Sequence, residues 1–161
     1  MYTPEEVAFQ EQAIGTSYLD KVQNLERLIL SNPSCLIDLP VSHLFTDKMY
    51  VRTLYAPAGS LVTTKIHKTQ HPFVVLKGKV SIVLQDGTVE QISAPYIGIT
   101  EPGTQRVGYV HEDVIWATFH VNEDNTKDLA VIEDRVIERC ELTAGRTSYE
   151  LAQELMHQRL S

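Results

Sequence analysis

The feature that most constrains the fold is a run of short, β-rich segments between Cys35 and Val121. The segments are rich in β-branched and aromatic residues, as strands are, and turn-forming residues separate them. They recur at roughly ten-residue intervals with no helical pattern between them, which predicts about eight strands or more. Asp86-Gly87 adds a hairpin signal, because Asp-Gly suits a tight type I′ turn. The expected strands are Lys48–Tyr55, Leu61–His67, Pro72–Leu76, Lys79–Leu84, Val89–Ser93, Tyr96–Thr100, Gln105–Val110 and Val114–Val121. Such a chain folds as an antiparallel sandwich or barrel.

Helical patterns lie at both ends of the chain. Each has apolar residues at helical spacing, and two begin with a capping box, in which a Thr is followed three residues later by a Glu. The expected helices are Thr3–Ile14, Ser17–Leu30, Lys127–Arg139 and one opened by Thr147-Ser148-Tyr149-Glu150. We therefore expect an N-terminal helical segment (1–34), a β-barrel (35–122) and a C-terminal helical segment (123–161).

Composition narrows the class of protein. The 161 residues are 43% hydrophobic, which is enough to build a core. The formal net charge of -7 repels phosphate backbones, so we expect no nucleic acid polymer as a partner. The first residues are polar and acidic, unlike a secretory signal, and no apolar run approaches the roughly 20 residues of a membrane span. We expect a cytoplasmic protein that does not bind membranes.

One stretch of the barrel carries residues with chemistry at regular intervals. Gly59 is followed by five residues and then by Lys65-Ile66-His67; His71 comes after three more residues and Gly78 after a further six. Residues two apart on a strand point to the same side, so Lys65 and His67 should face one side together. A turn then returns His71 beside them, and Gly78 permits the tight reversal that we expect after it.

These intervals resemble the first signature of the cupin superfamily, in which a glycine, His-x-His, a glutamate and a second glycine follow one another at the same spacing. The segment Glu101–Arg106 resembles the second signature, with Glu101 in place of its proline and Arg106 in place of its histidine. The resemblance implies a mainly β, cupin-type double-stranded β-helix, or jelly-roll barrel, with helices at both ends. It also places the family's four metal ligands at Lys65, His67, His71 and Arg106.

The residues at these positions leave two uses open. Lysine and arginine are cationic and have no acceptor for a divalent ion. His120 could restore a metal site, because it lies in phase with Trp116 on the last expected strand. His67, His71 and His120 would then hold one divalent transition metal for an isomerase, lyase or dioxygenase.

The second use, which we prefer, is the binding of a small anion. Lys65 and Arg106, supported by His67 and His71, would form a cationic cluster for a carboxylate or phosphate group. Arg52 would join them if its strand face points inward. Aromatic side chains would stack on a planar ligand. The candidates for stacking are Trp116, Tyr109 and Tyr96.

The region from Val41 to Val121 also resembles a group of small cupin-like proteins found mostly in bacteriophage genomes. The residues that carry this resemblance include Arg52, the Pro57-Ala58-Gly59 turn, Ala94-Pro95-Tyr96 and His111–Trp116. It implies sequestration of a nucleotide-like host defence signal in the host cytoplasm, by a homodimer or higher homo-oligomer. A structural role in assembly, with the terminal helices as contacts, is a third alternative.

Overall fold

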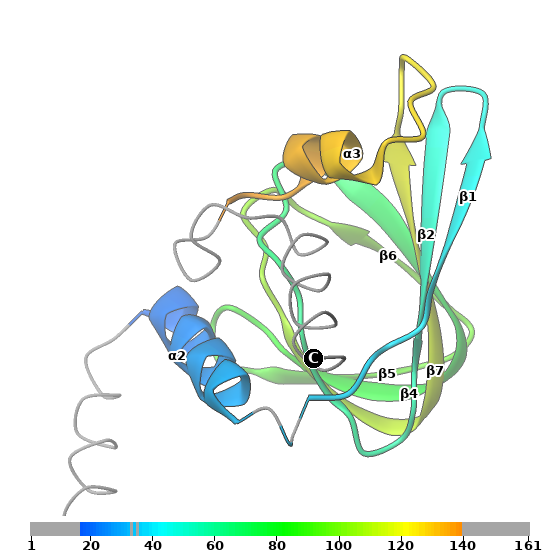
Figure 1. The fold of residues 1–161 in the computed structure, drawn as a ribbon. Coiled ribbons are helices and arrows are strands. Elements are labelled where there is room, and N and C mark those ends of the chain that lie inside the picture. Colours follow the sequence, from blue (N-terminus) through cyan, green and yellow to red (C-terminus); the bar gives the residue numbers. More distant parts are fainter. Residues whose placement is uncertain (1–16, 33, 35, 140–161) are drawn as a thin grey trace, which may run out of the picture.

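A computed structural model describes residues 17–32, 34 and 36–139 (Figure 1). The expected helices over Thr3–Ile14 and from Thr147 lie outside these residues. The described helices are α2 (Tyr18–Ser31) and α3 (Leu129–Val136). The strands are β1 (Val41–Thr46), β2 (Met49–Ala56), β3 (Leu61–Thr63), β4 (His71–Val83), β5 (Val89–Ser93), β6 (Tyr96–Thr100) and β7 (Val107–Val121).

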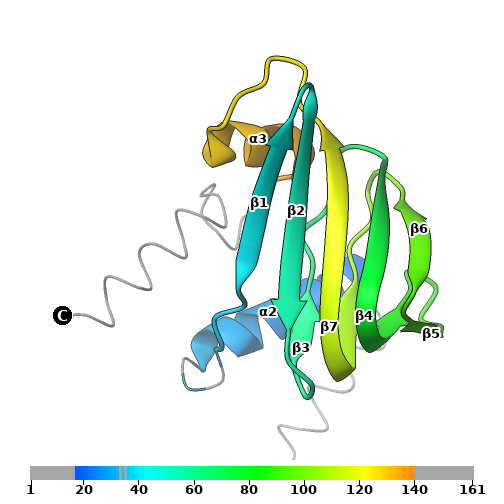
Figure 2. The ribbon, with the colours of Figure 1, turned by 90° about the vertical axis from the view of Figure 1, so that its right-hand side faces the viewer.

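The strands form two antiparallel sheets that share the long strands β4 and β7. One sheet has the order β1-β2-β7-β4-β6 and uses the second half of β7 and the first half of β4. The other has the order β3-β7-β4-β5 and uses the remaining halves. Figure 2 shows the first sheet face-on, with β1, β2, β7 and β4 side by side. This is the strand order of a double-stranded β-helix, so the predicted fold class is confirmed.

The long strands are where the structure differs from our expectation. We expected four strands over Pro72–Leu76, Lys79–Leu84, Gln105–Val110 and Val114–Val121, but these form two continuous strands, β4 and β7. Their mutual register shifts near Lys79, where β4 passes from one sheet to the other. Gly78 therefore lies inside a strand, at a bulge, and the tight reversal expected there is wrong.

Two smaller differences concern β1 and β3. The exposed edge strand β1 was not among the expected strands, and β3 ends at Thr63 although we expected a strand through His67. Residues 64–70 cross instead to the segment that follows α3. In this crossing, Lys68 N donates to Val136 O and Glu138 N donates to Ile66 O, each at 2.8–2.9 Å. The crossing carries His67 to the inner side of the barrel.

The core lies between the two sheets and is built mainly from inward-facing residues of the shared strands β4 and β7, with Ala56 of β2 and Ile92 of β5. Its buried members are Ala56, Phe73, Val75, Val80, Ile82, Ile92, Val110 and Val114. In α2, Ser17 and Asp20 form a capping box, and the Tyr18 hydroxyl donates to Val83 O at 2.9 Å, which ties the helix to the end of β4. In the described part of the chain, no helix is long and apolar enough to cross a membrane.

Candidate functional site

Strand register gathers polar residues on the inner face of the first sheet. Arg52 of β2 lies opposite Thr118 of β7, and Thr118 lies opposite the buried Phe73 of β4. Residues directly opposite in an antiparallel pair share a face, and residues two apart on a strand share it as well. His120 and His71, two residues beyond Thr118 and Phe73, therefore join Arg52 on the inner face.

Three histidines pack together there. The ring centroids of His71 and His120 are 4.3 Å apart, those of His67 and His71 are 4.6 Å apart, and those of His67 and His120 are 6.4 Å apart. His71 and His120 are buried, with 3% and 5% of their surface exposed. The structure thus brings together the three histidines that we named as metal-ligand candidates.

Hydrogen bonds assign the tautomers of two of these rings. Thr69 O can only accept, so His71 Nδ1 donates to it at 3.1 Å and His71 Nε2 carries the lone pair. For His120, we assign the Thr118 hydroxyl as donor to Arg52 O at 3.4 Å. Its oxygen then accepts from His120 Nε2 at 3.0 Å, and the lone pair lies on His120 Nδ1. In the described part of the chain, His71 Nε2, His120 Nδ1 and His67 Nδ1 are buried nitrogens with no hydrogen-bond partner.

The three imidazoles are neutral at physiological pH. Burial, together with the neighbouring histidines and Arg52, lowers the pKa of His67 to about 4 and that of His120 to about 3. Burial also lowers the pKa of His71. Neutral imidazoles offer lone pairs, so the cluster presents hydrogen-bond acceptors, and it does not provide the positive charge that we expected from His67 and His71.

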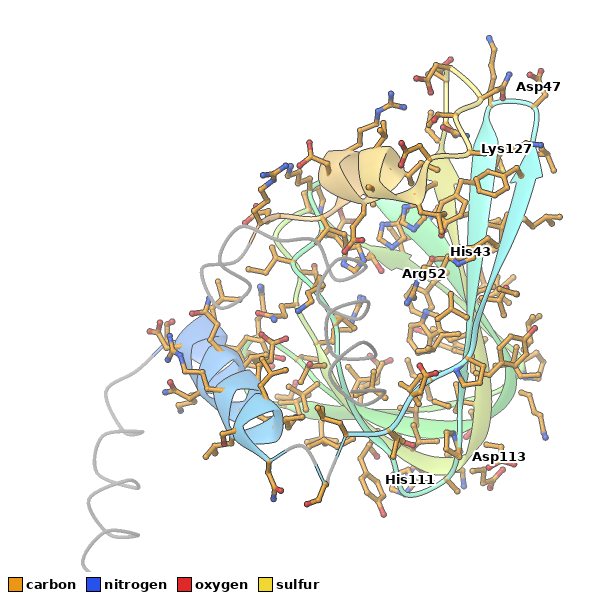
Figure 3. All side chains as sticks on the ribbon, viewed as in Figure 1. His43, Asp47, Arg52, His111, Asp113 and Lys127 are labelled. Carbon is orange, nitrogen blue, oxygen red and sulfur yellow. The ribbon has the colours of Figure 1, made fainter. Side chains whose placement is uncertain are left out.

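The positive charge on the inner face comes from two arginines. Figure 3 shows Arg52 pointing from β2 toward the interior of the barrel. Arg52 keeps exposed surface, yet burial lowers its pKa, while the nearby Glu133 and Tyr50 act on it in the opposite direction. No hydrogen bond or ion pair joins its guanidinium to another described residue. Arg106 is half-buried; its Nη1 donates to Thr100 Oγ1 at 2.9 Å, and its guanidinium carbon lies 5.3 Å from the centre of the Phe73 ring.

Aromatic residues border these charges. Trp116 stacks on Phe73 with centroids 4.4 Å apart and planes 10° apart, and Tyr96 lies 5.9 Å from Phe73 on the other side. A Cβ at Gly98 would overlap the Phe73 ring, so glycine is what lets this ring lie against β6. Behind His120, the buried Tyr50 ring stacks at 6.0 Å.

Two predicted site residues lie elsewhere. Lys65 Nζ is 3.9 Å from Glu26 Oε1 on α2, and Glu26 is buried, so Lys65 serves as the counter-ion of a helix carboxylate. Tyr109 is 47% exposed on the outer face of β7, where its ring contacts His111. Neither side chain joins the inner-face group formed by the histidines, Arg52 and Arg106.

Two threonines orient this group, a role that the sequence did not predict for either of them. Thr118 fixes the His120 ring, and Thr100 holds the Arg106 guanidinium. Thr118 could have been found from its phase, because it lies two residues from both Trp116 and His120. No sequence pattern marks Thr100, which lies at the end of β6, opposite His71 and six residues before Arg106.

The resemblance to cupins implies a metal, and the residues fit one only in part. The three unpartnered nitrogens are of the right chemical type. In the arrangement that the structure gives, however, no three His, Cys, Asp or Glu side chains among the described residues form a group that could hold a metal ion. The charged Arg52 beside the rings also opposes a dication. We therefore derive no chemistry from a metal.

Comparisons with known proteins agree with this architecture. No family model matches the sequence, and no curated protein matches it. Similar solved structures include a Klebsiella pneumoniae protein with a double-stranded β-helix domain, at TM-score 0.47 and 20% identity over 55% of this chain and 81% of that one. An RmlC-like cupin family protein from Methanocaldococcus jannaschii has TM-score 0.45 and 10% identity over 53% and 82%.

A third similar structure is an acetylacetone dioxygenase from Acinetobacter johnsonii, at TM-score 0.43 and 16% identity over 52% of this chain and 59% of that one. Of these three structures, two are described as double-stranded β-helix or cupin proteins and the third as an enzyme. At these TM-scores and identities, the likenesses decide nothing about the chemistry of the site.

Proposed function

We propose that this protein binds a small anionic molecule on the inner face of its barrel, with Arg52 and Arg106 recognising the negative charge. The observation that carries the proposal is the inward-facing guanidinium of Arg52, which no described residue pairs. An arginine offers a planar fork of donors that matches a carboxylate or phosphate group. Phe73 and Trp116 supply an aromatic surface beside it.

Substitution of the arginines tests this proposal. Inorganic phosphate is titrated into the full chain, with affinity measured by calorimetry. Arg52→Gln and Arg106→Gln should each weaken binding about tenfold or more, because each removes a charge-assisted hydrogen bond. Lys127→Gln removes the same unit charge from an exposed position and should leave affinity unchanged. If both arginine variants bound phosphate with wild-type affinity, the proposal would be wrong.

The proposed anion site differs from the one predicted from the sequence in the role of Lys65. The sequence predicts that Lys65 binds the anion directly. Its contact with Glu26 makes it a structural counter-ion. The two arginines therefore carry the proposal, and Lys65 has no part in it.

A second function, the binding of a divalent transition metal, is favoured by one observation, the three unpartnered histidine nitrogens. A cupin-type isomerase, lyase or dioxygenase would need such a metal. Protein treated with EDTA is titrated with Zn²⁺ and analysed for bound metal. For this function, one equivalent should bind with the wild type and not with His120→Phe. Absence of stoichiometric uptake by the wild type would eliminate it.

The narrower hypotheses rest on the resemblance to bacteriophage proteins alone. They are the sequestration of a nucleotide-like host defence signal, a host-cytoplasmic location and a homo-oligomeric state. Native mass spectrometry of the protein isolated from cells addresses the ligand and the subunit number together. Each stays a prediction.

A further inference from the structure

The histidine cluster presents buried acceptors that nothing in the described chain satisfies. His71 Nε2 and His120 Nδ1 carry lone pairs, because Thr69 O and Thr118 Oγ1 take the N–H groups on the opposite sides of the two rings. A buried acceptor without a partner costs about 1–3 kcal/mol. Two such nitrogens on rings 4.3 Å apart mark a place where a donor group is expected.

The arginine of the proposed anion site lies next to these acceptors. Arg52 pairs with Thr118, so His120, two residues farther along β7, is its diagonal neighbour on the same face, at roughly 7–8 Å between backbones. The guanidinium is close enough to lower the pKa of both His120 and His67. The positively charged hydrogen-bond donors of Arg52 and the unpartnered imidazole acceptors therefore lie side by side on one face.

A ligand that satisfies both must carry two kinds of group. A simple anion fits Arg52 but brings lone pairs toward the lone pairs of the imidazoles, which repel it. A molecule with a hydroxyl or amino group a few atoms from its anionic group places donors at the imidazoles and its charge at the guanidinium. Because the assigned tautomers place the lone pairs at particular ring nitrogens, the ligand must present its donor groups at those positions as well as carry a negative charge.

We propose that the ligand is a small hydroxylated or aminated anion, whose hydroxyl or amino groups donate to His71 Nε2 and His120 Nδ1 while its carboxylate or phosphate lies at Arg52. The inference rests on the proposed anion-binding function and adds the chemical class of the ligand. Hydroxy acids and sugar phosphates share this chemistry, so the experiment includes both types of anion.

Two matched pairs of probes test the inference on the EDTA-treated full chain. Methyl phosphate is compared with glycerol 3-phosphate, and propionate with lactate. Lactate differs from propionate by one hydroxyl group alone, and glycerol 3-phosphate adds two hydroxyl groups and two carbons to methyl phosphate. In the wild type, the hydroxylated member of at least one pair should bind about tenfold more tightly or better, since it satisfies acceptors that the other leaves bare. The pair that shows the larger preference identifies the type of anion.

Ring substitutions assign the preference to the histidines. His71→Phe and His120→Phe keep an aromatic ring and remove the nitrogens, so the ratio of the two affinities within the preferred pair should fall toward one in each variant. Should either variant fail to fold, the wild-type protein gives the same information, because the hydroxylated probe should shift the imidazole ¹⁵N resonances of both histidines and methyl phosphate should not.

The outcomes separate the two proposals. Equal affinity within both pairs would overturn the inference about hydroxyl and amino groups and leave the anion site standing. Absence of binding by all four probes would overturn the anion site as well. Tight, stoichiometric Zn²⁺ uptake that is lost in His120→Phe would assign the unpartnered nitrogens to a metal. That result would also overturn the inference about hydroxyl and amino groups.

Discussion

Gly78 is the residue at which β4 passes from one sheet to the other, and a residue with a side chain would be strained at this position. Its φ is +86°, and a Cβ there would overlap the backbone oxygen of Asp113 and lie 2.7 Å from that of Glu112. These oxygens belong to β7, the most extensively paired neighbour of β4, and cannot move without breaking that pairing. We expect Gly78→Ala to lower the free energy of unfolding by about 3 kcal/mol or more.

Gly59 provides a matched control for this prediction. It has the same φ of +86°, but a Cβ there would meet nothing within 4 Å. Gly59→Ala should therefore cost only the left-handed backbone conformation, about 1–2 kcal/mol. Urea unfolding of the two variants measures the difference. Equal losses of stability would mean that the close approach of Asp113 is relieved at no cost.

Lys65 shows what a residue-by-residue comparison with a sequence signature cannot detect. The spacing Gly59–Lys65–His67–His71–Gly78 correctly brought His67 and His71 to one place, because the intervals reflect local strand geometry. The direction of Lys65 depends on Glu26, which is 39 residues earlier by number and comes close only when α2 packs on the barrel. No local pattern encodes that contact.

At the scale of elements, the sequence predicted strand positions well and strand continuity badly. Every expected strand overlaps an observed one, because β-branched and turn-forming residues mark strands locally. The breaks expected near Gly78 and His111–Asp113 are bends within β4 and β7. A charged or glycine-containing bend looks like a turn in sequence, and only the pairing of β4 with β7 shows that the strands continue.

This error of continuity explains the misplacement of Tyr109. When Gln105–Val110 and Val114–Val121 are read as separate strands, their phases are independent, and Tyr109 and Trp116 can share a face. In the single strand β7 the phase is continuous, so Val110, Val114 and Trp116 face inward and Tyr109 faces outward. His120 was predicted with the correct neighbours because it shares the phase of Trp116 without any intervening bend.

At the scale of the whole molecule, the site's neutral histidines are linked to stability. Burial lowers the pKa of His67, His71 and His120 in the folded state, with His67 at about 4 and His120 at about 3, whereas the ordinary value is about 6.5. Below pH 6.5 the unfolded chain therefore binds protons at these residues that the folded chain does not bind. Stability must fall as the pH decreases from about 6.5 toward the folded pKa values.

Between pH 7 and pH 5, a range in which ordinary carboxylates stay ionised, we expect the free energy of unfolding to fall by about 1–2 kcal/mol for each of His67 and His120. His71 adds to this fall in the same direction. Urea unfolding at the two pH values measures the fall. His120→Phe removes one of these groups and should reduce the fall by about 1–2 kcal/mol. An equal fall in the wild type and in His120→Phe would show that His120 is not held neutral by the fold, and would remove the bare acceptor on which the ligand class depends.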